Sequence, residues 1–298
     1  MKYLIVALSL ISFTGRAQIA ITEFEASNVK KVKVKGSFCN VMATTGSKTY
    51  VKGVINGNGN EGDYEFRSSI EGETLMLEVI KRVKRSGFRM ENSVIDLMVK
   101  QGTAIEIVNS SGDINARNLQ ANEFTFESTS GDVDVKDIIG NTSLGSTSGD
   151  IEGSNIQGNL KGGSTSGDIT ISEVSGEINV KSTSGNIEIT NTTTDIFAQS
   201  TSGEIELSEV KGQLEIRATS GNIEGMEIEL TGDSQFRTSS GEIELDLINN
   251  IDALSFDLQA SSGSLNVDGK QADKSIYLKR GGYWVNGISS SGSQRYSN

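Results

Sequence analysis

Two columns of acidic side chains are the residues of this chain best placed to do chemistry. A Ser-Gly-acid-Ile pattern recurs every 18 residues, and the residue after its glycine is an acid or an asparagine: Asp113, Asp132, Asp150, Asp168, Asn186, Glu204, Asn222 and Glu242. A second set follows two positions later: Asp134, Glu152, Glu188, Glu206, Glu224 and Glu244. Carboxylates stacked in water repel one another by roughly 1 kcal/mol per pair, and a hard cation such as Ca²⁺ relieves that repulsion.

The acid columns therefore predict loose Ca²⁺ binding, with Asp132, Asp150, Asp168 and Glu152 as ligands. No other cofactor is expected. The alternative is that the acids form a solvated face that keeps the protein soluble, with no bound metal. The pattern lacks the Gly-Gly-x-Gly-x-Asp repeat of calcium β-rolls, which favours this alternative.

Hydroxyl side chains precede the same glycines and form a third column. The runs are Ser146-Thr147-Ser148, Ser164-Thr165-Ser166, Ser182-Thr183-Ser184 and Ser200-Thr201-Ser202. Regular hydroxyl arrays on flat faces can bind ice or sugars. Serine and threonine before a glycine more often satisfy backbone groups of a turn, and we favour that interpretation.

Two further groups of residues are candidates for ligand binding. A basic cluster of Arg82, Lys84, Arg85 and Arg89 surrounds Phe88 and could hold anionic glycan or lipid headgroups; the alternative is a charged hairpin tip. Tyr283 and Trp284 could stack on a sugar ring. The alternative for these aromatic residues is that, with Tyr277, they plug the last coil of the fold.

The composition argues against an enzyme. The chain has no histidine and one cysteine, which excludes a Ser-His-Asp triad, a histidine-liganded zinc and an internal disulfide. Polysaccharide lyases and hydrolases with β-helix folds build a cleft from long inserted loops, whereas the repeats between Gly131 and Gly221 carry no insertion. We therefore predict that the protein is not an enzyme, with a carbohydrate-active enzyme as the alternative.

The elements that must position these residues follow from the apolar pattern. Two positions after each repeat glycine the residue is aliphatic: Ile114, Val133, Ile151, Ile169, Ile187, Ile205, Ile223, Ile243 and Leu265. Most residues two positions further on are apolar too, and this alternation predicts short half-buried strands. A fixed period of 18 predicts stacked rungs. The fold class is therefore all-β, a single-chain parallel β-helix, right-handed as parallel connections usually are.

Atypical capping coils are expected at both ends of this solenoid. Residues 18–100 lack the 18-residue period, but strand-like alternation occurs at 30–35, 48–55, 64–70, 74–84 and 93–100. We interpret them as an irregular N-terminal β cap, followed by the repeat β-helix at 101–268 and a C-terminal cap and tail at 269–298. Terminal coils must cover an open edge. The tail from 289 to 298 is polar and is expected to fray.

The charge distribution and the N-terminal residues indicate the partners and the cellular location of the protein. Residues 101–268 carry 28 acidic and 7 basic side chains, so this region should repel nucleic acid. Lys2 and the apolar stretch from Tyr3 to Phe13 resemble a signal peptide, with cleavage expected after Ala17. We expect export to the periplasm, cell surface or medium, and no membrane-spanning segment. Cys39 is expected to be a small buried residue.

The combination of an export signal, a non-repetitive strand-rich start and stacked Ser-Gly-Asp-Ile units resembles the bacterial putative-adhesin family of secreted β-strand-repeat proteins. That resemblance implies a right-handed β-helix and an envelope or surface location, and it supplies no catalytic residues. We therefore predict a secreted, non-catalytic binding or spacer module whose partner is an envelope polysaccharide or another surface component. A self-assembling structural rod is the second alternative.

Overall fold

A computed structural model describes residues 18–57, 60–83 and 92–298. The predicted signal peptide lies outside these residues. The chain forms two compact units, Met1–Gly149 and Asp150–Asn298, which are described separately. In the described part of the chain, no helix is both long enough and apolar enough to cross a bilayer.

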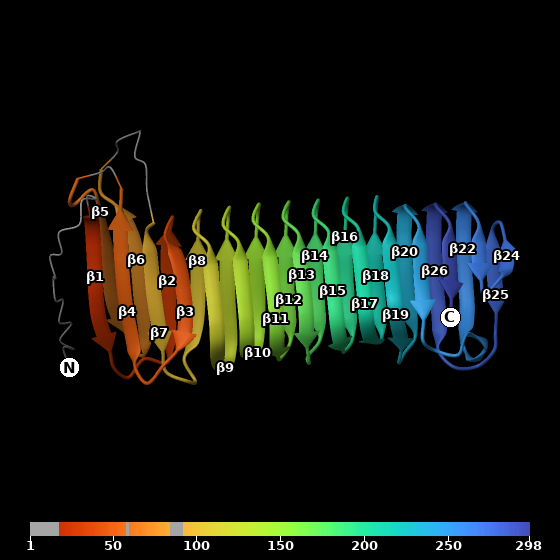
Figure 1. Ribbon diagram of the computed structural model, residues 1–298, viewed down its shortest axis with the longest axis horizontal. Helices are drawn as coiled ribbons and strands as arrows, with labels where there is room; N and C mark the ends of the chain where they lie inside the picture. The colour runs from red at the N-terminus through yellow and green to blue at the C-terminus, as the bar shows by residue number, and fades with distance from the viewer. Residues whose placement is uncertain (1–17, 58–59, 84–91) are drawn as a thin grey trace. The chain divides into compact units, whose positions relative to one another are not determined.

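Two parallel sheets build the repeats of the second unit (Figure 1). The strand that follows each repeat glycine lies in the first sheet, which comprises β11 (Ile151–Gln157), β13 (Ile169–Val174), β15 (Ile187–Thr193), β17 (Ile205–Gly212), β19 (Ile223–Leu230) and β21 (Ile243–Leu247). The second strand of each rung lies in the second sheet, which comprises β12 (Leu160–Ser164), β14 (Ile178–Ser182), β16 (Ile196–Ser200), β18 (Leu214–Ala218) and β20 (Ser234–Ser240). The predicted parallel β-helix is confirmed.

The core of this unit is a set of stacked aliphatic columns. The register pairs Ile187 with Ile205 and Ile205 with Ile223, so equivalent residues of successive rungs lie directly above one another. All three are fully buried. Burying such a side chain contributes roughly 1.5–3 kcal/mol, so the columns predicted from the 18-residue period supply most of the driving force for stacking.

The repeat glycines are required because successive rungs approach closely at this point. A methyl group on Gly203 would overlap the backbone carbonyl of Gly185, and one on Gly221 would overlap that of Gly203. The contact is with backbone, which cannot rotate out of the way. This steric limit explains why the position of the repeat glycine is occupied by glycine, and by no other residue, in every rung.

A column of left-handed residues bends the chain within each of the strands β11, β13, β15, β17 and β19. Asn155, Glu173, Asn191, Glu209 and Glu227 have φ values between 50° and 55°. Asparagine adopts this conformation readily, whereas other L-residues do so at a cost of roughly 1–2 kcal/mol. Three of the five residues are glutamates, which do not favour this conformation. The bend of the chain at this position is therefore imposed by the stacked strands on either side of it.

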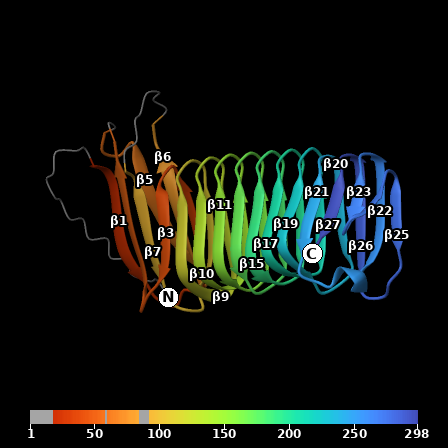
Figure 2. The same cartoon turned by 45° about the vertical axis from the view of Figure 1, so that its right-hand side comes forward.

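The C-terminal coil is inserted between two earlier coils. β26 (Trp284–Ser291) pairs in parallel with both β20 and β22 (Ser255–Ser262), and β27 (Gln294–Ser297) pairs with both β21 and β23 (Leu265–Val267) (Figure 2). Tyr296 is fully buried, with its ring 5.7 Å from that of Phe256 and 6.4 Å from that of Phe236. The prediction that residues 289–298 form a frayed tail is therefore wrong.

The aromatic plug predicted for the last coil is also wrong in its residues. Tyr277 is 64% exposed and Tyr283 is 43% exposed. The outermost strands of this unit are instead β24 (Lys270–Ala272) and β25 (Ser275–Leu278), which run antiparallel to β23 and β22. Phe236, Phe256 and Tyr296 fill the interior, because these are the aromatic residues at inward positions of their strands.

The first unit also contains a coil that lies out of chain order. Its strands are β1 (Gln18–Ala26), β2 (Lys31–Ser37), β3 (Asn40–Thr45), β4 (Thr49–Asn56), β5 (Tyr64–Glu71), β6 (Thr74–Lys81), β7 (Val94–Val99), β8 (Ala104–Asn109), β9 (Ile114–Ser128) and β10 (Val133–Ser146). β2 pairs in parallel with β6 and β8, and β3 pairs with β7 and β9. Hairpin-like excursions are present as expected, since β5 is antiparallel to β6 and β4 is antiparallel to β1 and β7.

Cys39 packs inside the first unit as expected. Its side chain is fully buried, and burial raises the pKa of its thiol to about 12. A thiol that stays protonated is a poor nucleophile and a poor metal ligand. Cys39 is therefore a core residue.

Candidate binding surfaces

The acids that follow the repeat glycines bond the backbone of the next rung. Asp168 donates its backbone N–H to Oδ1 of Asp150 at 2.9 Å, and Asn186 donates its own to Oδ1 of Asp168 at 2.7 Å. The same bond recurs in the pairs Asp132–Asp113, Glu204–Asn186 and Glu242–Asn222, at 3.0–3.1 Å. These side chains are exposed or half-buried. One oxygen of each accepts the backbone N–H of the next rung, while the rest of the group faces solvent.

The predicted Ca²⁺ ligands are distributed along this column and the neighbouring one. In the second unit, Asp150 and Asp168 accept or donate the bonds just described, and Glu152 points outward from β11 opposite Thr170. Asp132 belongs to the first unit, where it donates its backbone N–H to Asp113. Within residues 18–57, 60–83 and 92–298, no three His, Cys, Asp or Glu side chains are grouped so as to hold a metal ion. Loose Ca²⁺ binding stays a prediction, and the residues present do not form a compact cage for it.

The second acid column lines a groove on the outer face of the first sheet. Glu188, Glu206, Glu224 and Glu244 are paired in register on successive strands. The groove has a volume of about 490 Å³, and Leu207, Gly225 and Met226 supply its apolar surface. A hydrogen bond to Glu204, together with burial and the charges of Glu206 and Glu244, raises the pKa of Glu224.

The hydroxyl column serves the turns, as favoured from the sequence. Ser164, Ser182 and Ser200 are buried, and the Oγ of each accepts the backbone N–H of the glycine three residues later at 2.8–2.9 Å. Ser146 does the same for Gly149 in the first unit. The first serine of each run is thus enclosed by the turn, and it cannot form part of an exposed binding array.

Most of the predicted basic cluster lies outside the described residues. Lys84, Arg85, Phe88 and Arg89 all fall within residues 84–91. Arg82 is described and forms an ion pair with Glu65 at 2.5 Å, which holds the pKa of that carboxyl below its ordinary value. Arg82 therefore behaves as a residue of a charged hairpin, and its role in ligand binding stays a prediction.

The outer face of the second sheet carries two rows of side chains that run across the strands. The first, which we call the aromatic row, reads Asn179, Phe197, Glu215, Gln235, Asn286, Asp257 and Tyr277. The second, the basic row, reads Lys181, Gln199, Arg217, Arg237, Ile288 and Gln259. Lys181 and Arg217 both lie over the ring of Phe197, at 5.1 and 5.8 Å from its centroid.

Trp284 and Tyr277 meet at the end of this face. Their ring centroids are 5.5 Å apart and their planes are inclined by 38°. Trp284 donates its backbone N–H to Oδ1 of Asp233 at 2.8 Å, which fixes the start of β26. Tyr283 is exposed beside Trp284 in the chain, and its backbone carbonyl accepts the N–H of Ser255. The structure thus brings Trp284 together with Tyr277, a residue that was assigned to the plug.

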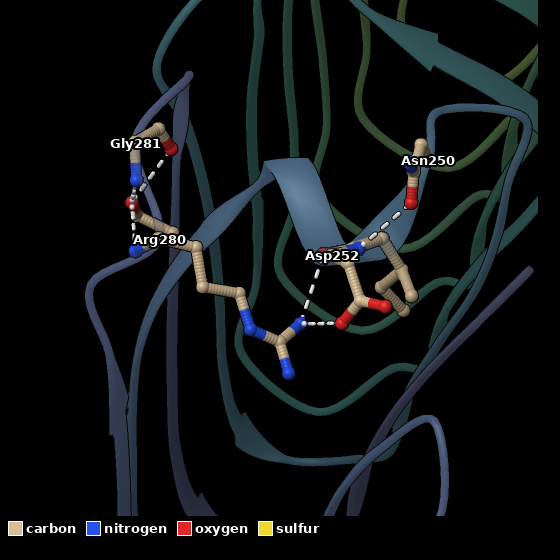
Figure 3. Close-up of polar contacts among 6 residues, drawn as sticks. Asn250, Asp252, Arg280 and Gly281 are labelled. Carbon is tan, nitrogen blue, oxygen red and sulfur yellow. Dashed lines mark hydrogen bonds and ion pairs between the residues drawn. The ribbon is translucent and has the colours of Figure 1, made fainter.

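A polar cluster holds the loop that leads to Trp284 (Figure 3). The Arg280 guanidinium bonds the backbone carbonyl of Ile251 at 3.0 Å and the carboxylate of Asp252 at 3.2 Å. Ser255 accepts the backbone N–H groups of Arg280 and Gly281 through its Oγ, both at 3.2 Å. The loop is therefore tied to β22 and to the short 3₁₀ helix at Ile251–Ala253, and the aromatic pair has a fixed support.

Residues 16–208 and 198–292 match the Toastrack DUF4097 family, a family of unknown function. This chain belongs to that family. The Toastrack fold is a β-helix, as observed in both units. No protein with a curated description matches the chain significantly.

Solved structures similar to this Toastrack protein include three from Parabacteroides distasonis and Bacteroides fragilis. A protein from Parabacteroides distasonis described as a putative lipid binding protein is 17% identical, with 92% of this chain and 95% of that chain covered and a TM-score of 0.45. A putative adhesin from Bacteroides fragilis is 14% identical, with coverages of 93% and 95% and a TM-score of 0.37. A second putative adhesin from P. distasonis is 11% identical, with coverages of 92% and 95% and a TM-score of 0.40.

Sequence reasoning missed most of the second-sheet face of this Toastrack protein. Phe197, Arg217 and Arg237 were not candidates, although each occupies an outward position in the second strand of its rung. The signal that could have identified them is the alternation of inward and outward residues in the second strand of each rung, of which the sequence analysis used only the inward ones. Its outward residues vary from rung to rung, so they show no period and only the register reveals that they lie side by side.

Proposed function

We propose that this protein is an exported, non-catalytic module that binds polysaccharide of the cell envelope through the second-sheet face of residues 150–298. The observation that carries the proposal is the pair formed by the exposed Tyr277 and the half-buried Trp284. Aromatic rings offer flat apolar faces on which sugar rings stack. The neighbouring outward side chains Asp257, Asn286 and Gln235 can exchange hydrogen bonds with sugar hydroxyls.

Support for a binding role without catalysis comes from the arrangement of the acids. The carboxylates and amides that follow the repeat glycines accept backbone hydrogen bonds. The second acid column places one outward glutamate on each of successive strands, at Glu188, Glu206 and Glu224. General acid–base chemistry on a glycosidic bond requires two carboxyl groups on opposite sides of one sugar. Columns along a flat sheet do not supply that geometry.

The first experiment measures binding of the labelled chain from Gln18 onward to envelope polysaccharide fractions, with and without Ca²⁺. We expect saturable binding that Trp284→Ala and Tyr277→Ala each weaken about tenfold, equivalent to ~1.4 kcal/mol. Met226→Ala is the matched control, because Met226 is 63% exposed but lies on the first sheet. Absence of binding to every fraction, or equal binding by the Trp284 and Met226 variants, would refute the proposal.

A further inference from the structure

The second unit is strongly acidic, yet one of its faces is basic. Residues 150–298 contain 22 acidic and 10 basic side chains, a net charge of −12. On the outer face of the second sheet from β12 to β20, the outward charges are Lys161, Lys181, Arg217 and Arg237 against the single acid Glu215. The column of glutamates lies on the other sheet. The charge of this unit is therefore divided between its faces.

The cations of this face are only partly neutralised by the protein. In the described part of the chain, no acidic side chain lies within ion-pair distance of Arg237, Lys181 or Lys161. Arg217 pairs with Glu215 through one terminal nitrogen, while its Nε is enclosed and has no hydrogen-bond acceptor. Arg237 and the exposed end of the Arg217 guanidinium are thus the groups of this row that can donate to a ligand, whereas the enclosed Nε of Arg217 cannot.

The spacing of these groups favours a linear ligand. Arg217 and Arg237 are paired in register on adjacent strands, and adjacent strands lie about 4.8 Å apart. Lys181 occupies the same row two strands before Arg217. The basic row therefore runs across the strands, beside the aromatic row that ends at Tyr277. An extended polymer lying along both rows would meet the cations on one side, and on the other the rings of Phe197 and Tyr277 with polar side chains between them.

We propose that this face binds a linear polysaccharide of acidic sugars, whose carboxylates pair with Arg217 and Arg237 while its sugar rings lie along the aromatic row. The proposal rests on the proposed function and names its ligand class. Guanidinium groups bind carboxylates through two parallel hydrogen bonds, which a neutral glycan cannot form. Lys181, Arg217 and Phe197 form one packed group, so the ring of Phe197 also holds the two cations in place.

Two other anionic partners fit the face less well. The exposed large apolar residues of this unit are Met226, Ile248, Tyr277 and Tyr283, and the basic row contains no exposed aliphatic side chain that would enter a lipid layer. Double-stranded nucleic acid carries one charge per about 1.7 Å, so the net charge of −12 of this unit repels it more strongly than a polymer with one carboxylate per sugar. A flexible chain of sugars can follow the basic row and avoid the acidic face.

The test compares two forms of one polymer by titration calorimetry. Polygalacturonate carries one carboxylate per sugar, and its methyl ester has the same backbone without the charge. We expect the full chain from Gln18 onward to bind polygalacturonate at least tenfold more tightly than the ester, with an affinity that falls as salt is added. Equal affinity for the two polymers would overturn the proposal.

Variants assign the charge effect to this face. We expect Arg237→Gln to lower the affinity for polygalacturonate about fivefold or more and the Arg217→Gln/Arg237→Gln pair to remove the preference over the ester, while Arg237→Lys retains part of it. Arg237 makes no ion pair among the described residues, so its replacement leaves the fold intact. Arg295→Gln, on the first sheet beside Glu244, is the matched control and should change nothing. Full affinity in the double variant would overturn the proposal.

Failure of this inference can be told apart from failure of the proposed function. If both polymers bind equally and Trp284→Ala weakens both, the module binds glycans but charge does not select them. If neither polymer nor any envelope fraction binds, the proposed function itself fails. Binding to phosphatidylglycerol vesicles that Arg237→Gln abolishes, without binding to polygalacturonate, would reassign the face to lipid and overturn the proposal.

Discussion

At the scale of single residues, acids of the two columns have different roles although they look alike in the sequence. Asp168 accepts the backbone N–H of Asn186, so its carboxylate is bonded by the rung above it. Glu224 has carboxylates on both neighbouring strands, at Glu206 and Glu244. The first kind of acid stabilises the stack. The second kind opposes it, because like charges directly across a parallel pair repel.

Glu224→Gln should therefore stabilise the protein. Its neutral amide removes the repulsion from Glu204, Glu206 and Glu244, and we expect the free energy of unfolding at neutral pH to rise by up to about 1 kcal/mol. Urea unfolding followed by circular dichroism measures the change. Glu188→Gln is the control, because Glu188 has a carboxylate on one side and Thr170 on the other. A larger gain from Glu188→Gln than from Glu224→Gln would contradict this account.

The pH dependence of the difference in stability between Glu224→Gln and the unsubstituted protein tests whether charge repulsion is its cause. The pKa of Glu224 is raised in the folded state, so its favourable contribution is complete below the ordinary value of 4.5 and is lost as pH rises through the raised folded value. The advantage of Glu224→Gln over the unsubstituted protein should accordingly be absent in acid and appear as pH increases toward neutrality. An advantage that does not vary with pH would show that packing, and not charge, is responsible.

At the scale of elements, the repeat glycines and the strand glycine Gly163, which faces open space, have opposite expectations. Gly203→Ala places a methyl group against the backbone of Gly185 and should destabilise the protein by about 1–3 kcal/mol, the usual range for overpacking. Gly163→Ala meets nothing within 4 Å and should be neutral or stabilise by roughly 0.4–1 kcal/mol. Thermal unfolding of the two variants decides this. Equal melting temperatures would contradict the close approach of the rungs.

The elements also show what the sequence could predict. Ile187, Ile205 and Ile223 recur with a fixed period, so the rungs and their core followed directly from the pattern. The left-handed corner at Glu209 did not, because glutamate has no preference for that conformation and only the stacked neighbours impose it. Trp284 was a candidate from the sequence, but Arg237 was not, because only the register of β18 with β20 places it beside Arg217.

At the scale of the whole molecule, each unit contains one coil that lies out of chain order. In the second unit, β26 and β27 each have a strand on both sides. Removal of residues 284–298 would leave the edges of β20, β21, β22 and β23 unpaired and would expose Phe236 and Phe256. Unpaired edges are templates for association. The segment 284–298 therefore supplies the hydrogen-bonding partners of the strands on both sides of the gap that its removal would leave.

We expect deletion of residues 284–298 to cause aggregation and to abolish cooperative unfolding of this part of the protein. Light scattering after size-exclusion chromatography measures the first effect, and thermal unfolding measures the second. Tyr296→Phe is the control, because it keeps the buried ring and removes only the hydroxyl, whose partner is Gln294 at 3.2 Å. A monodisperse truncated protein that unfolds cooperatively would contradict this role of the C-terminal coil.

The inserted C-terminal coil also sets the order of events during folding. The rungs from β11 to β19 pair with neighbours that are close in the chain, so they can form one after another as the polypeptide emerges. The coil of β22 and β23 reaches its native neighbour only after β26 and β27 have been made. This part of the second unit therefore cannot close around an incomplete chain. A polypeptide that stops short of Tyr296 keeps this gap open, and the gap closes only when β26 and β27 have been added.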